Sequence, residues 1–458
     1  DVQGVPELDD NTHTAKIVFY VNANRVMSVR RINFAGNLKT DDSVLRREMR
    51  QFEGAQASVE KIDLSKVRLQ RLGFFSDVKI DNARVPGTTD QVDLNVAVTE
   101  QASGSISASL GYSQNAGLVF GANVSQSNFL GTGNRVSVGL NRSDVRNSYN
   151  LSFLDPYFTP EGISRGYNIY LRQTKLDNLN ISNYATDSLG ANISFSYPID
   201  ETETISFSAG IDQTKINLGV NPSEAVYKFT NENGNNVMTY TGTASWGRNT
   251  LNRGTFPTAG ASQSVAMEMG LPGSDISFYK LTYNAQRYFP VRNEWVGRGY
   301  ARLGYGDALN GEGLPFYRNF FGGGFGSVRG YRDYSMGPRS QRLSLSNPAV
   351  LLPTAEAIGG NVQVEGGLEL IFPVPFIEDK SKIRTLAFFD VGNVFDTNSK
   401  SVNGLDFKPS LGNLRYSVGV GMSWITPIGP LTFAIAKPLN AKENDDTQAF
   451  QFSLGQGF

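Results

Sequence analysis

The sequence predicts a mainly β protein, in which a small α+β domain of order β-α-α-β-β precedes a 16-stranded antiparallel transmembrane β-barrel. Two observations predict the barrel. From Gly104 onward, short segments with alternating apolar and polar residues are separated by turns rich in Gly, Asn, Asp and Ser. The links between these segments are short at one end of the predicted barrel and long at the other. Helical periodicity within residues 44–72 predicts the different domain that comes first.

Composition excludes several classes of protein. The 458 residues carry 42 Lys+Arg against 43 Asp+Glu without basic blocks, which argues against a nucleic-acid partner. No apolar run approaches the roughly 18 residues of a transmembrane helix. The chain has no cysteine and one histidine, His13, so thiolate metal sites, multi-histidine sites and cysteine or serine–histidine catalysis are disfavoured. We therefore expect no metal, no cofactor and no enzymatic activity.

Residues 26–102 are predicted to form the small α+β domain. Its expected elements are one strand, two helices and two further strands: Val26–Phe34, Val44–Arg50, Val59–Leu72, Ser76–Val85 and Val92–Glu100. Acids at the start of the first helix face its positive end. The second helix is expected to end at Gly73 and to bury a stripe of apolar residues: Ile62, Leu64, Val67, Leu69 and Leu72.

An internal repeat indicates that a similar domain lies upstream. Thr14–Asn22 leads into Val26 in the same way that Gln91–Thr99 leads into the segment after Glu100, about 78 residues later. Residues 1–25 are therefore interpreted as the remnant of an upstream repeat.

Residues 103–458 are predicted to form the barrel. Its expected strands are residues 104–113, 118–126, 134–142, 147–154, 166–174, 189–197, 203–212, 238–248, 261–269, 275–288, 295–305, 361–373, 383–391, 415–426, 430–437 and 449–458. The average of about 22 residues per strand and connection suits strands of ~9–11 residues that cross a bilayer at a tilt. The long links, 213–237, 306–360 and 392–414, all fall on one side, as in outer-membrane barrels.

Side-chain parity predicts which face of the barrel meets lipid. In the last strand Phe450, Phe452, Leu454 and Phe458 share one face, and Gln451 and Ser453 share the other. Because hydrocarbon cannot satisfy polar groups, the apolar face must point outward and the interior must be polar.

The longest link, 306–360, holds the sharpest candidate site. Its glycine-rich part lacks the GK[ST] and the following helix of a phosphate-binding loop. We expect Arg329 to tie this loop down by reaching into the lumen and pairing with carboxylates. Parity turns Glu369 inward, whereas Asp390 shares its parity with Leu386 and Phe388, so parity alone leaves its direction open.

These residues resemble a known family. Val328, Arg329, Gly330 and Tyr331 match the VRG[F/Y] signature of BamA-type outer-membrane assembly proteins, whose superfamily also holds two-partner secretion transporters. Other similar pieces are Asn128–Gly133, Asp155–Phe158, Leu368–Pro373, Phe389–Gly392 and Phe450–Phe458. The small domain resembles a POTRA module, so the resemblance covers essentially the whole chain.

The resemblance implies a function without ATP: folding β-barrel proteins and inserting them into the outer membrane, with the POTRA-like domain in the periplasm. It implies unfolded outer-membrane clients, assembly-complex lipoproteins and outer-membrane lipids as partners. It also implies that Arg329 contacts the lumenal acids Glu369 and Asp390. Further POTRA modules upstream would bind partners.

The resemblance finally implies a lateral seam between the first and last strands. Its residues would be Ser105, Ile106, Ser107, Ala108, Ser109, Leu110 and Gly111 against Gln451, Phe452, Ser453, Leu454, Gly455, Gln456, Gly457 and Phe458. Gly455 and Gly457 would weaken the last strand and leave an edge on which an incoming strand could pair. The alternatives are a two-partner secretion transporter and a passive porin-type channel, and the plainer interpretation of the glycines is that they relieve crowding.

Overall fold

The computed structural model describes residues 2–9, 14–21, 26–176, 182–309, 313–344, 347–374, 382–398, 407–426 and 429–455. His13 and the predicted seam residues Gln456, Gly457 and Phe458 lie outside these ranges. The chain divides into two compact units. The first comprises Asp1–Gly104 with Gln126–Asn134, and the second comprises Ser105–Ser125 with Arg135–Phe458.

The first unit contains the predicted α+β domain. Its strands β3 (Ser28–Ala35), β4 (Phe75–Arg84) and β5 (Gln91–Glu100) form a sheet of order β3-β5-β4, with β3 parallel and β4 antiparallel to β5. The helices α1 (Asp42–Glu48) and α2 (Val59–Arg71) lie between β3 and β4 in the chain. The predicted order β-α-α-β-β is confirmed.

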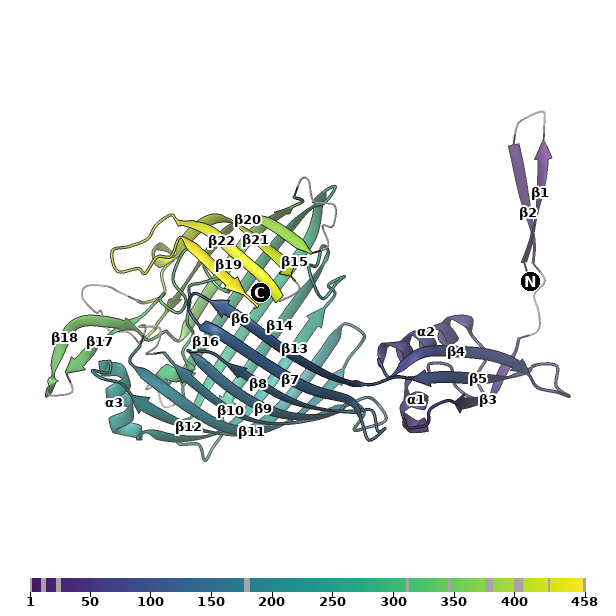
Figure 1. Ribbon diagram of the computed structural model, residues 1–458, viewed down its shortest axis with the longest axis horizontal. Coiled ribbons are helices and arrows are strands. Elements are labelled where there is room, and N and C mark those ends of the chain that lie inside the picture. Colours follow the sequence, from purple (N-terminus) through teal and green to yellow (C-terminus); the bar gives the residue numbers. More distant parts are fainter. Residues whose placement is uncertain are drawn as a thin grey trace. The chain divides into compact units, whose positions relative to one another are not determined.

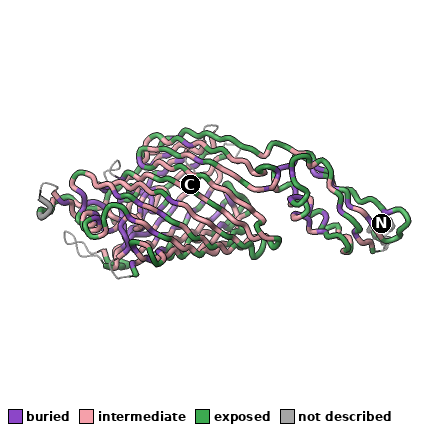
Figure 2. Tube along the Cα trace, turned by 90° about the horizontal axis from the view of Figure 1, so that it is seen from below, coloured by how far each residue is buried: buried purple, intermediate pink, exposed green. Residues whose placement is uncertain are grey.

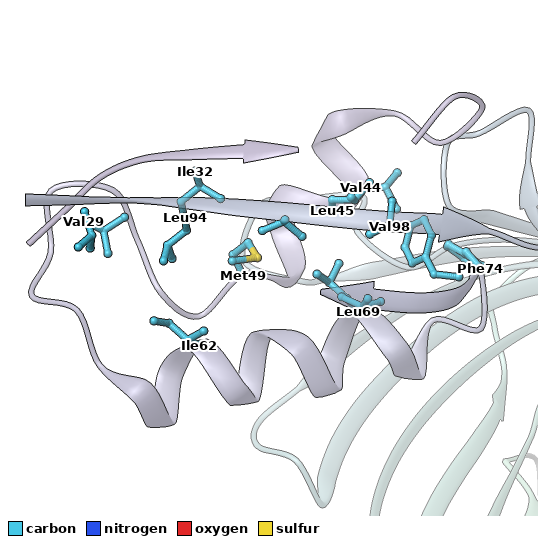
Figure 3. Close-up of a cluster of buried hydrophobic side chains, with 14 residues drawn as sticks. Val29, Ile32, Val44, Leu45, Met49, Ile62, Leu69, Phe74, Leu94 and Val98 are labelled. Carbon is cyan, nitrogen blue, oxygen red and sulfur yellow. The ribbon is translucent and has the colours of Figure 1, made fainter. Parts of the chain in front are cut away.

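A single apolar core holds this domain together. Side chains from α1 and α2 meet those of the sheet in Figure 3, where Leu45, Leu69 and Leu94 are fully buried. The predicted stripe of α2 is wrong at Leu64 and Val67, which are 41% and 39% exposed. Ile62 and Leu69 are seven residues apart, two helical turns, and share the buried face, whereas Leu64 and Val67 fall on the opposite side.

Local features mark both ends of α2, and the predicted end at Gly73 is one of them. The hydroxyl of Ser58 accepts a hydrogen bond from the Lys61 N–H at 3.4 Å and caps the start of the helix. Gly73 follows the helix with φ +71°, a left-handed conformation that favours glycine.

Before this domain, β1 (Val2–Asp9) and β2 (Thr14–Val21) pair as an antiparallel hairpin. The interpretation of residues 1–25 as the remnant of an upstream repeat stays a prediction, as do the domain limits 26–102 and 103–458.

The second unit is a closed antiparallel barrel (Figure 1). Its 16 strands are β6 (Gly104–Ser113), β7 (Gly117–Phe129), β8 (Asn134–Arg142), β9 (Arg146–Asp155), β10 (Ser164–Lys175), β11 (Tyr184–Pro198), β12 (Glu203–Leu218), β13 (Asn236–Asn249), β14 (Gly260–Gly270), β15 (Phe278–Arg292), β16 (Trp295–Ala308), β19 (Val362–Phe372), β20 (Ile383–Phe395), β21 (Arg415–Thr426), β22 (Gly429–Pro438) and β23 (Phe450–Leu454). The predicted fold class is confirmed.

The long links contain structure that the sequence pattern did not predict. Between β12 and β13 lies the helix α3 (Glu224–Asn233), and between β16 and β19 lie the 3-10 turn η2 (Phe316–Arg318) and the hairpin of β17 (Arg339–Ser344) and β18 (Asn347–Ala357). Another 3-10 turn, η3 (Leu411–Asn413), precedes β21. The hairpin stands outside the barrel sheet, so β16 pairs directly with β19.

The faces of the barrel wall follow the predicted parity. In β19 the side chain of Leu368 is 64% exposed, whereas its neighbour Glu369 is buried. In β23 Gln451 and Ser453 are buried and Phe450 is exposed. The barrel wall in Figure 2 is accordingly coloured mostly intermediate and exposed, since many of its apolar side chains have no protein neighbour outside. Among the residues described, no helix is long and apolar enough to cross a membrane.

Candidate functional site

Arg329 lies inside the barrel, bound to carboxylates of the wall. Its Nε donates a hydrogen bond to Asp390 Oδ2 and its Nη2 donates one to Asp390 Oδ1, both at 2.7 Å. Its backbone N–H also donates to Asp390 Oδ2 at 3.1 Å. The same Nη2 lies 2.9 Å from Glu369 Oε1. The guanidinium group of Arg329 therefore makes contacts with both its edge and its face. The edge binds Asp390 bidentately, and the face lies 3.6 Å from the ring centre of Phe388.

The direction that parity left open for Asp390 is inward. Asp390 has no exposed surface, and Leu386 and Phe388 turn inward with it and are buried. An apolar inward face is accommodated there because the Phe388 ring packs beneath the Arg329 guanidinium. The sequence could not reveal this packing, since it needs a residue 59 positions away.

Two further wall residues complete the arginine site. Arg298 Nη1 donates to Glu369 Oε2 at 2.9 Å, so this carboxylate is shared between two arginines. The Tyr300 hydroxyl donates to Asp390 Oδ1 at 2.9 Å. Arg298 faces Glu369 directly in the register of β16 and β19. Sequence reasoning missed both residues, although the parity of residues 295–305 could have indicated them.

The loop backbone around Arg329 fits the lumen closely. Gly330 has φ +94°, and a Cβ there would lie 3.1 Å from the Cβ of Ala436 on β22. The flanking side chains of Val328 and Tyr331 are buried, with Met336, in a small apolar cluster. The glycine therefore lets the backbone approach the wall at a conformation that other residues rarely adopt.

A second arginine anchors an earlier part of the same loop. Arg318 lies 3.3 Å from Asp212 on β12 and 3.1 Å from Glu268 on β14. Lys280 Nζ donates to the Arg318 carbonyl at 2.7 Å. The long loop is thus held at two separate places on the barrel wall.

Among the described residues, no cluster of acidic or histidine side chains is suited to a metal ion.

The predicted seam is sparsely paired. Up to Gly455, where the described chain ends, β23 pairs with β6 at Ser453–Ser113 and Leu454–Tyr112 alone. By contrast, β11 and β12 pair continuously from Tyr184–Leu218 to Pro198–Thr204. Within the part of the chain that the structure describes, most main-chain groups of β6 therefore have no ladder partner on β23.

The predicted seam residues of β6 are exposed on both faces. This holds for all of them except Gly111: Ser105, Ile106, Ser107, Ala108, Ser109 and Leu110. Ile106 is the most exposed large apolar side chain among them, at 84%. These residues do not pair with β23 within the described chain, and the paired residues of β6 lie just after them.

Glycines bring the two backbones together where the pairing ends. A Cβ on Gly455 would lie 2.7 Å from Gly111 Cα, and a Cβ on Gly111 would lie 2.4 Å from the Leu454 carbonyl oxygen. Gly455 has φ +79°, so the last strand leaves its extended conformation there. Its N–H donates to the Pro430 carbonyl at 2.8 Å, which extends the pairing of β23 with β22 by one residue.

Comparisons with known proteins agree with this architecture. Residues 128–458 match the Omp85 superfamily domain, and residues 27–101 match the POTRA family, described as Surface antigen variable number repeat. The outer membrane protein assembly factor BamA of Neisseria meningitidis is 35% identical over the whole chain. This chain spans 60% of that relative's length.

Solved structures are similar as well. The crystal structure of BamA from Haemophilus ducreyi lacking POTRA domains 1–3 matches 99% of this chain and 88% of its own, with a TM-score of 0.84 and 34% identity. CdiB from Escherichia coli, at 14% identity and a TM-score of 0.62, shares the fold over 99% of this chain and 80% of its own.

Proposed function

The chain belongs to the Omp85 superfamily, and from this premise we propose that it folds β-barrel proteins and inserts them into the outer membrane. The proposed activity needs no ATP and no covalent chemistry, because new main-chain hydrogen bonds and burial of apolar surface in lipid supply the driving force. The barrel resides in the outer membrane, with the POTRA domain in the periplasm.

The observation that carries this proposal is the short pairing of β23 with β6 over the residues described, up to Gly455. A strand edge with free N–H and C=O groups is a template for strand addition, and it needs little side-chain specificity. An incoming client strand would pair with the exposed edge of β6, at Ser105–Leu110. Successive strands of the client would then extend from that edge into the membrane.

The partners follow from the same geometry and from the relatives' function. Clients are unfolded outer-membrane β-barrel chains, whose strands carry the same alternation as this barrel. Lipids of the outer membrane contact the outward apolar side chains, such as Leu368 and Ile435. Lipoproteins of an assembly complex are proposed as partners by resemblance to the BamA relatives. The loop held by Arg329, Glu369 and Asp390 is proposed to occupy the lumen while a client is inserted.

A disulfide across the seam tests the proposal. Tyr112 and Leu454 are paired in register, and the chain has no native cysteine, so Tyr112→Cys with Leu454→Cys gives one defined crosslink. The full chain is placed in lipid vesicles, and insertion of an unfolded barrel client is followed by its resistance to protease. We expect oxidation to stop insertion and reduction to restore it.

A matched control uses a junction that is fully paired. Ile193 and Ala209 face each other in the register of β11 and β12, so a disulfide between cysteines at these positions adds a crosslink without touching the seam. Insertion should continue in this control. Undiminished insertion through the oxidised seam would contradict the proposal.

Two alternatives remain distinguishable by experiment. A two-partner secretion transporter would export one partner protein and would not restore growth to a strain depleted of its assembly factor, whereas the proposed function predicts growth. A passive porin-type channel would give large and steady single-channel conductance, which the loop anchored inside the barrel by Arg329 argues against.

A further inference from the structure

The segment Gly330–Asp333, which follows the anchored Arg329, lies against the last strand and against the residues that follow the first strand. Its main chain pairs with the approach to β23: Gln448 N–H donates to the Gly330 carbonyl at 2.8 Å, and Arg332 N–H donates to the Asp446 carbonyl at 2.9 Å. Tyr331 and Thr447 form an antiparallel bridge between these bonds. The loop thus behaves as a short extra strand beside residues 446–448.

Gln451 extends this contact into β23 itself. Its side chain faces the lumen and is 1% exposed. Its Nε2 donates to the Tyr331 carbonyl at 2.9 Å, and its Oε1 accepts from the Gly330 N–H at 3.4 Å. A buried amide that has both of its polar ends occupied is costly to pull away from its partners.

The other side of the seam reaches the same region through side chains. Gln114, directly after β6, accepts hydrogen bonds at its Oε1 from Gln448 Nε2 at 2.8 Å and from the Phe452 N–H at 3.1 Å. Side chains therefore extend the contact between the two strands beyond the paired residues Ser113 and Ser453.

We propose that Gln451 is a positioning residue that holds the last strand closed through the long loop. Arg329 fixes the loop to β19 and β20, Gln451 ties β23 to the loop, and the seam opens when this tie breaks. The proposal rests on the proposed function only in so far as seam opening is the step that admits a client.

The closed and open populations can be measured without any client. Cysteines at Tyr112 and Leu454 carry spin labels, and the distance between the labels is measured in the full chain in lipid nanodiscs. Gln451→Met keeps the length of the side chain and removes both hydrogen bonds. We expect the ratio of open to closed seam to rise roughly fivefold, the change in an equilibrium constant that the loss of one hydrogen bond produces, because the 3.4 Å bond from the Gly330 N–H contributes little.

Ser453→Ala is the matched control variant. Ser453 is the next inward residue of β23, is also buried, and its hydroxyl has no hydrogen-bond partner among the described residues. We expect its seam distances to equal those of the wild type. A general loss of stability would also move labels at Ile193 and Ala209, where β11 and β12 are fully paired, and Gln451→Met should leave that distance unchanged.

Gln451→Glu provides a second variant if Gln451→Met does not fold. It keeps an acceptor for the Gly330 N–H, and it replaces the donor to the Tyr331 carbonyl with an oxygen, so the seam should again open. Wild-type seam distances in whichever variant folds would overturn the inference.

The client-insertion assay runs in parallel and keeps the two proposals apart. If the labels separate in the variant while the wild type inserts no client, the proposed function fails and the role of Gln451 stands. If the wild type inserts clients and the labels do not separate, the role of Gln451 fails and the proposed function stands.

Discussion

Replacing Arg329 with alanine removes the cation that ties the long loop to the barrel wall. Arg329 is 4% exposed, and Asp390 has no exposed surface. Removing one partner of a buried ion pair costs about 3–5 kcal/mol. We expect the lower end, about 3 kcal/mol, because Tyr300 still donates to Asp390 and Arg298 still pairs with Glu369. This free energy corresponds to a roughly 150-fold larger population of released loop.

Digestion with proteinase K measures that population in the folded barrel. When the loop closes faster than it is cut, the cleavage rate follows the fraction of molecules with the loop released. We therefore expect cleavage within residues 313–344 to accelerate by up to roughly 150-fold in Arg329→Ala. The cut sites are mapped by mass spectrometry.

The matched control is Arg332→Ala. Arg332 is exposed in the same loop, and its side chain makes no hydrogen bond or ion pair among the described residues. Its loss should leave the cleavage rate within about twofold of the wild type. Wild-type resistance of Arg329→Ala would refute the reasoning, because the anchor would then contribute nothing to the position of the loop.

Three further predictions concern other parts of the chain. Leu69→Ala should lower the stability of the POTRA domain by about 2–5 kcal/mol and Leu64→Ala by less than about 1 kcal/mol, because only Leu69 is buried. Hydrogen exchange of residues 28–100 measures both losses. Equal losses would contradict the observed buried face of α2. Burial raises the pKa of Glu356, in the hairpin outside the barrel, so its ionised form is disfavoured when folded. The stabilisation from the protonated form is therefore present at low pH and lost as the pH rises through the raised pKa. Glu356→Gln should remove this pH dependence. Hydrogen exchange of the hairpin, compared between the variant and the wild type at each pH, measures it. Gly455→Ala should lower the yield of the disulfide between seam cysteines at Tyr112 and Leu454, because the new Cβ would clash with β6. The control Gly247→Ala, whose new Cβ would have no atom nearer than 3.8 Å, should leave the yield unchanged. An unchanged yield in Gly455→Ala would show that the close approach of the two strands is unimportant.

The barrel was predictable because every strand that crosses a lipid bilayer has to turn its apolar side chains outward, at alternate residues. In β23 the alternation of Phe450, Phe452 and Leu454 with Gln451 and Ser453 matches the exposed and buried positions of the structure. The short links, such as residues 199–202 between β11 and β12, were predictable from their turn residues. The number of strands followed from these two patterns.

The structure within the long links was not predictable in this way. The helix α3 and the hairpin of β17 and β18 depend on one another: the Ser340 hydroxyl accepts from the Ala225 N–H at 3.1 Å, and Leu343 N–H donates to the Pro222 carbonyl at 2.8 Å. Such contacts join segments more than 100 residues apart, and a local pattern contains no trace of them. Leu64 of α2 is a different kind of error. The sequence pattern predicted that this apolar residue is buried, whereas the structure leaves it exposed.

The candidate site was partly visible in the sequence. Arg329 in the glycine-rich loop and the inward parity of Glu369 indicated the anchor, and the resemblance supplied Asp390. The roles of Arg298, Tyr300 and Phe388 depend on which strands become neighbours, and the tie between Gln451 and Tyr331 depends on where a 53-residue link folds back. Both are properties of the assembled barrel.

The position of the Arg329 anchor has a consequence for permeability. Its carboxylate partners lie on β19 and β20, and β20 is separated from β23 by the two strands β21 and β22. When β23 moves away from β6, these ion pairs can stay intact, so the loop that they hold can remain inside the barrel. Under the proposed function, a client would then enter the membrane at the seam while the anchored loop still occupies the barrel interior.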